Sequence, residues 1–192
     1  MKAKFTVAAG LTLGEDRSIT FAETPMLMVT QFAGMRVSTD YSALIDSTDG
    51  AYAKAVKRGK FTGDAGQSIV VSLGRQNLPQ EYLVVIGLGR AQKFGCSEIR
   101  SLMRLVVEAA IAKRVDKVTI PFLPKRTTAS NLTLAQTAHI MRCVAIDVLE
   151  NKRSDRELEI EFFCTAQARR HLLKGLNRKR RCHPCKDSDH SH

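Results

Sequence analysis

The sequence predicts an α/β protein, a three-layer α/β/α sandwich around a mixed, mostly parallel sheet. Short apolar runs of strand length alternate along the chain with longer runs whose apolar residues repeat every three or four positions. Two of the expected strands are apolar at nearly every position, as is typical of strands covered on both faces. The chain has 192 residues, 44% of them hydrophobic, which is enough for one domain with a sizeable core.

Six strands are expected, each of them short and rich in Val, Ile, Met or Phe. In chain order they are Phe5–Ala8, Met26–Phe32, Ser68–Leu73, Tyr82–Leu88, Val115–Phe122 and Leu158–Cys164. We expect the last five to share one sheet. Ser68–Leu73 and Tyr82–Leu88 are the most continuously apolar and should be covered on both faces. Leu158–Cys164 alternates polar and apolar residues, which is typical of an edge or half-exposed strand.

Four helices are expected between and after these strands, from the period of their apolar residues and from their start signals. They are a helix within Ser47–Arg58, a helix with Ser97 as its N-cap, a helix that the capping box Thr133-x-x-Gln136 starts, and Ala166–Leu176. Residues 1–176 are expected to form the folded domain. We expect residues 177–192 to be a disordered basic tail containing cysteine and histidine.

The charge of the chain is unevenly distributed. The net charge is +11 at pH 7, and +6 of it lies after residue 161. A basic C-terminal segment indicates a polyanionic partner such as nucleic acid, or else a solvated tail that keeps the protein soluble. The candidate nucleic-acid contacts are Arg169, Arg170, Lys174, Arg178, Lys179, Arg180, Arg181 and Lys186.

Two observations bear on the compartment. No apolar run approaches the roughly 18 residues that span a bilayer, which excludes a membrane-spanning protein and argues against a membrane partner. The five cysteines are an odd number at scattered positions, unlike the disulfide framework of a secreted domain. The sequence therefore predicts a protein of the reducing cytoplasm.

Signals for a metal site are weak. A CxxC pair near the C-terminus, with histidines close behind, has ligands that zinc accepts, but a second ligand pair at a fixed spacing is not apparent. These candidates are Cys182, Cys185, His190 and His192. His139 and Cys143 stand four residues apart on a predicted helix, a spacing compatible with shared ligation but more typical of an imidazole beside a buried thiol. The sequence therefore predicts no bound metal and no cofactor.

Three stretches, taken in order, resemble the N-terminal domain of the leucyl (cytosol) aminopeptidase family. They are Ser47–Val56, Phe61-Thr-Gly-Asp-Ala-Gly-Gln67 and Tyr82-Leu-Val-Val-Ile-Gly-Leu-Gly89. In that family a helix leads into an F-x-G-x-x-G turn, and a later strand closes on G-L-G. Ile111–Pro121 fits the family's helix-to-strand step, so the resemblance covers roughly residues 21–176. It implies a macro-domain-like fold.

The resemblance also shows what the sequence lacks. Family members continue into a catalytic domain that binds two divalent metals through Asp and Glu carboxylates and a Lys, around a stretch N-T-D-A-E-G-R. No segment of the chain matches that stretch. The acidic residues between 147 and 161 are more easily interpreted as a solvated surface. We therefore expect no catalytic residues and no peptidase activity in this chain.

The macro-like fold raises the question of ADP-ribose binding. Gly87 and Gly89 end a strand, where backbone N–H groups could bind an anion such as a nucleotide phosphate. Macro domains that bind this ligand carry an Asn-rich strand end, which this sequence lacks, and two glycines more often serve a tight turn. An ADP-ribose or nucleotide binder is therefore the third hypothesis.

The first hypothesis is a stand-alone, non-catalytic homologue of the aminopeptidase N-terminal domain that acts in assembly, regulation or nucleic-acid binding, as a homo-oligomer. In the family this domain lies at the periphery of a hexamer, and some bacterial members bind DNA. The second hypothesis is a truncated or split subunit whose partner is a separate catalytic subunit. A neighbouring reading frame with the metal-ligand stretch would favour the split enzyme.

Overall fold

The computed structural model describes residues 1–10, 17–74, 77–121, 132–152 and 155–179. In these ranges six strands form one sheet in the order β1-β6-β5-β2-β4-β3. They are β1 (Lys2–Ala9), β2 (Met26–Gln31), β3 (Ser68–Ser72), β4 (Tyr82–Gly87), β5 (Lys117–Ile120) and β6 (Glu157–Cys164). Every pair of neighbours is parallel except β3 and β4. The mixed, mostly parallel sheet is confirmed, and all six expected strands belong to it.

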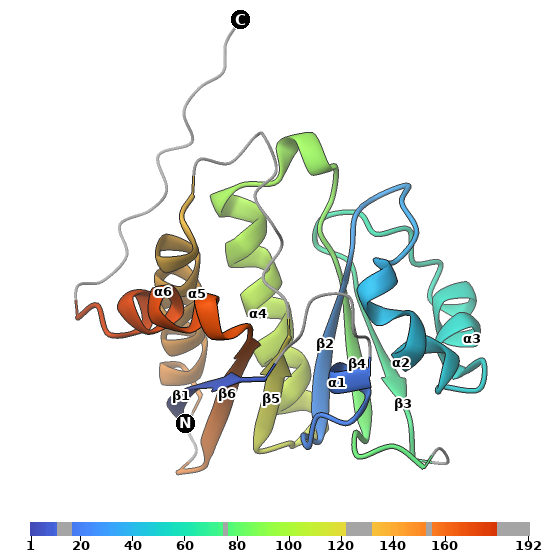
Figure 1. Ribbon diagram of the computed structural model, residues 1–192, viewed down its shortest axis with the longest axis horizontal. Coiled ribbons are helices and arrows are strands. Elements are labelled where there is room, and N and C mark those ends of the chain that lie inside the picture. The colour runs from blue at the N-terminus through green and yellow to red at the C-terminus, as the bar shows by residue number, and fades with distance from the viewer. Residues whose placement is uncertain (11–16, 75–76, 122–131, 153–154, 180–192) are drawn as a thin grey trace, which may run out of the picture.

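The helices surround this sheet (Figure 1). In chain order they are α1 (Arg17–Thr20), α2 (Ser42–Asp46), α3 (Ala51–Arg58), α4 (Cys96–Lys113), α5 (Leu134–Glu150) and α6 (Ala166–Leu176), with single turns η1 (Thr39–Tyr41) and η2 (Ala91–Lys93). Helix α6 has its predicted bounds. The capping box of α5 is confirmed, because Thr133 and Gln136 each accept the other's backbone N–H, at 3.2 and 2.8 Å.

One predicted helix start is wrong. Helix α4 begins after Gly95 rather than Ser97, because the Glu98 carboxylate accepts the Gly95 N–H at 2.8 Å and so satisfies an N-terminal donor two residues earlier. Helix α3 lies within its predicted range Ser47–Arg58 and begins at Ala51, because Asp49 and Gly50 have left-handed φ angles of 45° and 75° that interrupt a helix. The short helix α2, which precedes this break, was not predicted.

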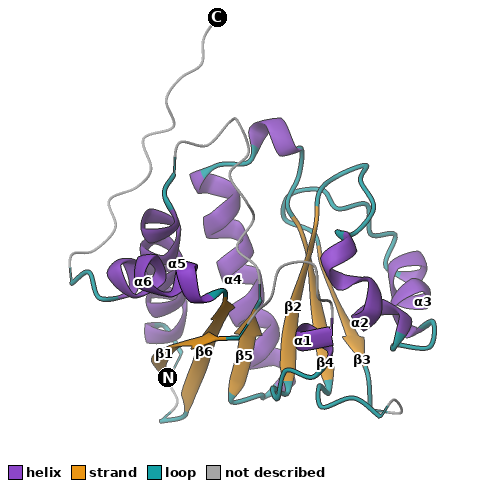
Figure 2. Ribbon diagram, in the orientation of Figure 1, coloured by secondary structure: helices purple, strands orange, loops and turns teal. Residues whose placement is uncertain are grey.

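Two hydrophobic cores lie on opposite faces of β2 and β4. Alternate side chains of each strand enter alternate cores, as the period of a strand requires. The core beneath α4, α5 and α6 includes Met26, Met28, Val84 and Ile86, and the core beneath α1, α2 and α3 includes Leu27, Val29, Leu83 and Val85. All eight side chains have no exposed surface. Figure 2 shows the two groups of helices, with α3 and α6 at opposite ends of the molecule.

The strands at either side of this centre are less covered. β3 lies at the edge of the sheet, where Val70 packs against one core and Ile69 against the other but both are only half-buried, so this strand is covered on both faces only in part. β6 lies between β1 and β5 and buries every second residue. Its alternating pattern allowed either an edge strand or a half-exposed strand, and β6 is the half-exposed one.

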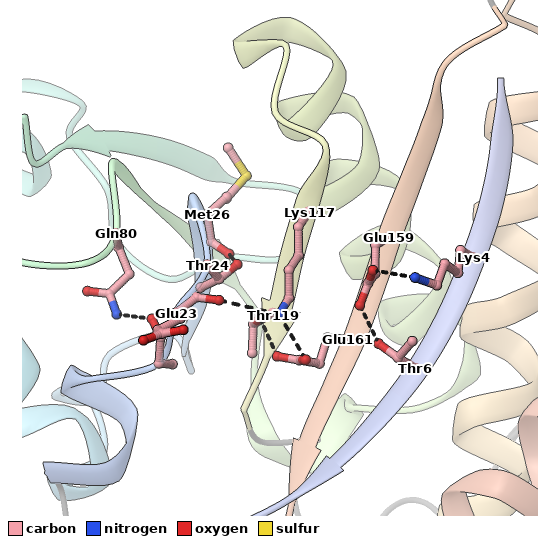
Figure 3. A network of polar contacts seen from close by, with 11 residues as sticks. Lys4, Thr6, Glu23, Thr24, Met26, Gln80, Lys117, Thr119, Glu159 and Glu161 are labelled. Atoms are coloured by element: carbon pink, nitrogen blue, oxygen red, sulfur yellow. Dashed lines mark hydrogen bonds and ion pairs between the residues drawn. The ribbon is translucent and has the colours of Figure 1, made fainter.

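The half-exposed face of β1, β6 and β5 carries a repeated polar contact (Figure 3). Each of two glutamates on β6 accepts hydrogen bonds from a Lys and a Thr that stand two residues apart on a neighbouring strand. The two sets are Lys4, Thr6 and Glu159, and Lys117, Thr119 and Glu161, with each donor–acceptor distance 2.9 Å. These contacts satisfy the polar side chains of this face of the sheet. Apart from the half-buried Phe163, the residues on this face belong to neither core.

The Glu159 contact predicts a specific pH dependence of stability. The Lys4 ammonium, and to a lesser extent the Thr6 hydroxyl, hold the pKa of the Glu159 carboxyl below its ordinary 4.5 against the opposing effect of burial. A lowered folded-state pKa stabilises the protein above the unfolded-state pKa, and this stabilisation is lost as the pH falls through the folded-state value. Glu159→Gln should therefore lower the urea midpoint near pH 7, and the difference from wild type should vanish once the pH is below the folded-state pKa of Glu159.

The matched control is Glu157→Gln, since Glu157 is an exposed residue on the same strand. Its unfolding midpoint should follow that of the wild type across the acid range. A Glu159→Gln difference of the same size at neutral and acid pH would contradict the role given to the ionised carboxylate.

Candidate functional site

The carboxyl ends of the parallel strands lie along one edge of the sheet, which is where ligands bind in open α/β sheets. The loop of residues 61–67, which follows α3, lies against this edge at β2 and β4. Gly89 connects the two strand ends, because it accepts the Ala33 N–H and donates its own N–H to Gly63, both at 2.9 Å. Gly87 donates to the Gln67 carbonyl at 2.9 Å. The loop is thus hydrogen-bonded to the strand end itself.

The fit between this loop and the strand ends leaves no room for side chains. A Cβ on Gly87 would lie 2.1 Å from the Asp64 carbonyl oxygen, and one on Gly63 would lie 2.7 Å from the Phe32 carbonyl oxygen. Gly63 also has a φ of 86°, which L side chains rarely adopt. Packing therefore requires glycine at the first glycine of the F-x-G-x-x-G turn, Gly63, and at the first glycine of the G-L-G strand end, Gly87.

The predicted anion-binding residues Gly87 and Gly89 lie at this edge, and their N–H groups already have partners. Gly87, Leu88 and Gly89 donate to the carbonyls of Gln67, Gln31 and Gly63 at 2.9 Å each. An anion bound there would have to displace one of these backbone hydrogen bonds. The contacts favour the tight-turn interpretation, and anion binding at the two glycines stays a prediction.

The sequence analysis did not predict a second concave set of N–H groups that lies at this edge. The Gln67 side-chain oxygen accepts the backbone N–H groups of Thr62, Gly63 and Asp64 at 2.9, 3.2 and 3.2 Å. Successive N–H groups that converge on one point form a nest that can bind an anion. Here the protein's own amide oxygen fills it. The signal for this contact is the glutamine directly after the glycine turn.

Helix α6 presents the second candidate surface. Thr165 caps it by accepting the Ala168 N–H at 3.4 Å. Its buried face is Leu172, Gly175 and Leu176, and a Cβ on Gly175 would lie 2.1 Å from the Ala135 carbonyl oxygen. The C-terminal half of α6 therefore packs closely against the start of α5, which fixes the orientation of the opposite face.

That opposite face is basic. The predicted contacts Arg169, Arg170, Lys174, Arg178 and Lys179 are all exposed. In the part of the chain that the structure describes, none of the five pairs with a carboxylate. Arg170 and Lys174 are four residues apart on α6 and so share one side of the helix, whereas Arg178 follows the C-cap Asn177. The other three predicted contacts, Arg180, Arg181 and Lys186, lie outside the described residues, as do the metal candidates Cys182, Cys185, His190 and His192.

His139 and Cys143 lie together on α5. The imidazole Nε2 is 3.9 Å from the Cys143 Sγ, and the two residues are 8% and 7% exposed. Burial lowers the pKa of His139, and the positive charges of Arg178 and Arg142 lower it further, against a smaller raising effect of the Gly175 backbone. Within the described ranges, no group of three or more His, Cys, Asp or Glu side chains could hold a metal ion.

None of the described helices is both long and apolar enough to cross a bilayer.

Comparison with protein families gives a match over most of the chain. The cytosol aminopeptidase family, N-terminal domain, matches residues 28–144. This range includes the glycine turn, the G-L-G strand end and both His139 and Cys143, and it ends before α6. No curated protein matches the chain.

Similar solved structures are macrodomains. A macrodomain variant from Oceanobacillus iheyensis has a TM-score of 0.65 at 13% identity, over 88% of this chain and 89% of that one. The macro domain of ganglioside induced differentiation associated protein 2 has a TM-score of 0.65 at 13% identity, over 89% and 81%. The Trypanosoma brucei macrodomain in complex with ADP has a TM-score of 0.66 at 11% identity, over 90% and 68%. At these identities the likeness establishes the macro-like fold alone.

The glycine contacts predict a large difference between two Gly→Ala changes. Gly87→Ala should destabilise the protein by about 1–3 kcal/mol or more, because its Cβ would overlap a backbone carbonyl that cannot move aside alone. Gly74→Ala is the matched control, since a Cβ there would meet nothing within 4 Å. It should change stability by no more than about 1 kcal/mol. Urea unfolding of both variants measures the difference, and equal midpoints would contradict the close approach at Gly87.

Proposed function

The chain belongs to the cytosol aminopeptidase N-terminal domain family, and from that premise we propose that it is a non-catalytic binding module whose basic helix α6 binds nucleic acid. The single observation that supports this role most strongly is the exposed, unpaired set of five cations on and directly after α6, described above. Residues 165–179 contain no Asp or Glu that could neutralise them. A surface of this kind attracts phosphates electrostatically.

The spacing of these cations suits a phosphate backbone. Arg170 and Lys174 are four residues apart, so they rise about 6 Å along the helix, close to two steps of about 3.4 Å along a DNA strand. Helix α6 contains no Phe, Tyr or Trp that could stack on a base. Contacts from this face would therefore be made to phosphates and would tolerate any sequence.

Assembly is the other part of this proposal. The family relationship supports a role beside other subunits, as a homo-oligomer or with a separate catalytic subunit. Binding of ADP-ribose or another nucleotide has weaker support. The Trypanosoma brucei neighbour is a complex with ADP, but in this chain the N–H groups of Gly87 and Gly89 are donated to backbone carbonyls.

Nucleic-acid binding through α6 and the residues after it predicts a steep salt dependence. With about four to six phosphates engaged on duplex DNA, the slope of log K against log salt should be about −4 to −5. Replacing Arg178, Lys179, Arg180 and Arg181 with Ala should flatten the slope by about one unit for each lost contact. Fluorescence anisotropy with a labelled duplex measures both slopes.

The matched control removes the same charge from the other end of the molecule. Lys54, Lys57, Arg58 and Lys60, on and after α3, are also exposed and lie far from α6 (Figure 1). Replacing these four with Ala should leave the affinity and slope close to those of the wild type. Equal losses in the two variants would show that net charge alone drives binding and would overturn the role of α6.

The purified chain should not hydrolyse leucyl substrates, with or without added manganese or zinc. Two-metal hydrolysis needs several converging carboxylates to bridge the ions and activate water. Over the described residues no such cluster occurs, and Glu159 and Glu161 are paired with lysines. Release of a chromogenic leaving group measures the activity. Saturable, metal-dependent turnover that copurifies with the chain through two columns would contradict the non-catalytic assignment.

A further inference from the structure

The outer edge of β3 directs backbone groups away from the sheet. Among the described strands β3 is the last of the sheet and pairs with β4 alone, in antiparallel register. Just beyond the strand, Leu73 donates its N–H to the Glu81 carbonyl at 2.7 Å. In an antiparallel ladder, residues that bond to the partner strand alternate with residues whose N–H and C=O groups point away from it. Counted back from Leu73, the outward residues are Ser68, Val70 and Ser72.

These outward groups have no backbone partner in the part of the chain that the structure describes. Outside the regular ladders and helices, no backbone hydrogen bond involves Ser68, Val70 or Ser72. The two serines are exposed, and Ile69 and Val70 are only half-buried. The edge therefore offers the N–H and C=O groups of three residues to another strand.

The two edges of the sheet differ in their protection. Soluble proteins commonly place lysine, proline or a bulge on an edge strand, which keeps other strands from pairing with it. The strand at the opposite edge, β1, carries the exposed Lys2 and Lys4. β3 has the sequence Ser-Ile-Val-Val-Ser, with neither a charge nor a proline. The edge of β3 is thus open to the addition of a strand.

The sequence of β3 matches itself when the strand is turned end to end. A two-fold axis at Val70 sets Ser68 opposite Ser72 of a second copy, Ile69 opposite Val71, and Val70 opposite itself. In this register the outward residues meet each other, and their three pairs would exchange about six hydrogen bonds. The β-branched side chains also meet β-branched side chains, which are favourable cross-strand pairs. The edge is therefore complementary to a second copy of itself.

We propose that two copies of this chain associate through β3, so that their sheets join into one. The inference rests on the homo-oligomer of the proposed function, to which it gives a surface, and it uses no residue of α6. Each copy has a net charge of +11, and the exposed cations of α3 lie at the same end of the molecule as β3 (Figure 1). Salt screens the repulsion between the copies. Association should therefore strengthen with added salt, whereas binding of DNA weakens.

Sedimentation velocity of the full chain tests the association. The protein is kept in a reductant, so that no disulfide joins two chains, and is studied over about a hundredfold range of concentration. We expect an equilibrium between monomer and dimer. A chain that stays monomeric over this range at both low and high salt would overturn the β3 interface. The salt slope of DNA binding tests α6 separately, so the two proposals can fail independently.

Charge reversal at the two exposed serines tests the register. A variant with Ser68→Lys and Ser72→Lys sets Lys opposite Lys in its own dimer, and a variant with Ser68→Glu and Ser72→Glu sets Glu opposite Glu. Like charges directly opposite each other are unfavourable, so each variant alone should associate more weakly than the wild type. Mixing the two sets Lys opposite Glu in both pairs and should restore association. A mixture that associates no better than its components would overturn the proposed register.

A change at Val70 tests the backbone contact. Val70→Pro removes an N–H that points away from β4, at a position where edge strands accept proline. A symmetric dimer loses this hydrogen bond twice, so association should weaken by about tenfold or more. Val70→Ala is the matched control, because it shortens the side chain and keeps the N–H. Equal dissociation constants for the two variants would contradict the pairing, and the charge-reversed mixture decides the question if the proline variant fails to fold.

Discussion

The close contact between the loop of residues 61–67 and the carboxyl ends of β2 and β4 constrains the rest of the molecule. The loop of residues 61–67 reaches the ends of β2 and β4 so closely that Gly63 and Gly87 have no space for a Cβ. The same contact engages the N–H groups of Gly87 and Gly89, and Gln67 fills the neighbouring nest with its own side chain. The edge where α/β sheets usually bind ligands is therefore occupied by the protein itself at this position.

The uneven covering of the sheet has a related consequence. β2 and β4 are buried on both faces, whereas β1, β6 and β5 contribute to the core beneath α4, α5 and α6 on one face only. On their other face two glutamates are paired with lysines and threonines, so this surface is polar and internally satisfied. The cations of α6 differ, because they are exposed and have no carboxylate partner among the described residues. We therefore propose α6 as the surface that binds a polyanion.

The sequence predicted the fold well and the surfaces only in part. Apolar period and the Thr133 capping box located every strand and the helices α4, α5 and α6, since burial dominates those segments. The start of α4 was misplaced because the Glu98 carboxylate accepts the Gly95 N–H, a local capping contact that the preference for serine at an N-cap does not reveal. The edge position of β3 was missed because strand order depends on pairing between distant segments. The Gln67 contact and the closeness of His139 to the end of α6 likewise arise only from folding.

An amide chemical-shift titration by NMR tests the central claim that this chain is a nucleic-acid-binding module with a closed carboxyl edge. With a short DNA duplex at low salt, the account predicts saturable changes in the amide chemical shifts of α6 and of the residues after it through Lys179. The amide shifts of Gly63, Gly87 and Gly89 should not change. With ADP-ribose it predicts no saturable shift at either place. Saturable shifts of Gly87 and Gly89 with ADP-ribose, together with an α6 that does not respond to DNA, would contradict the account.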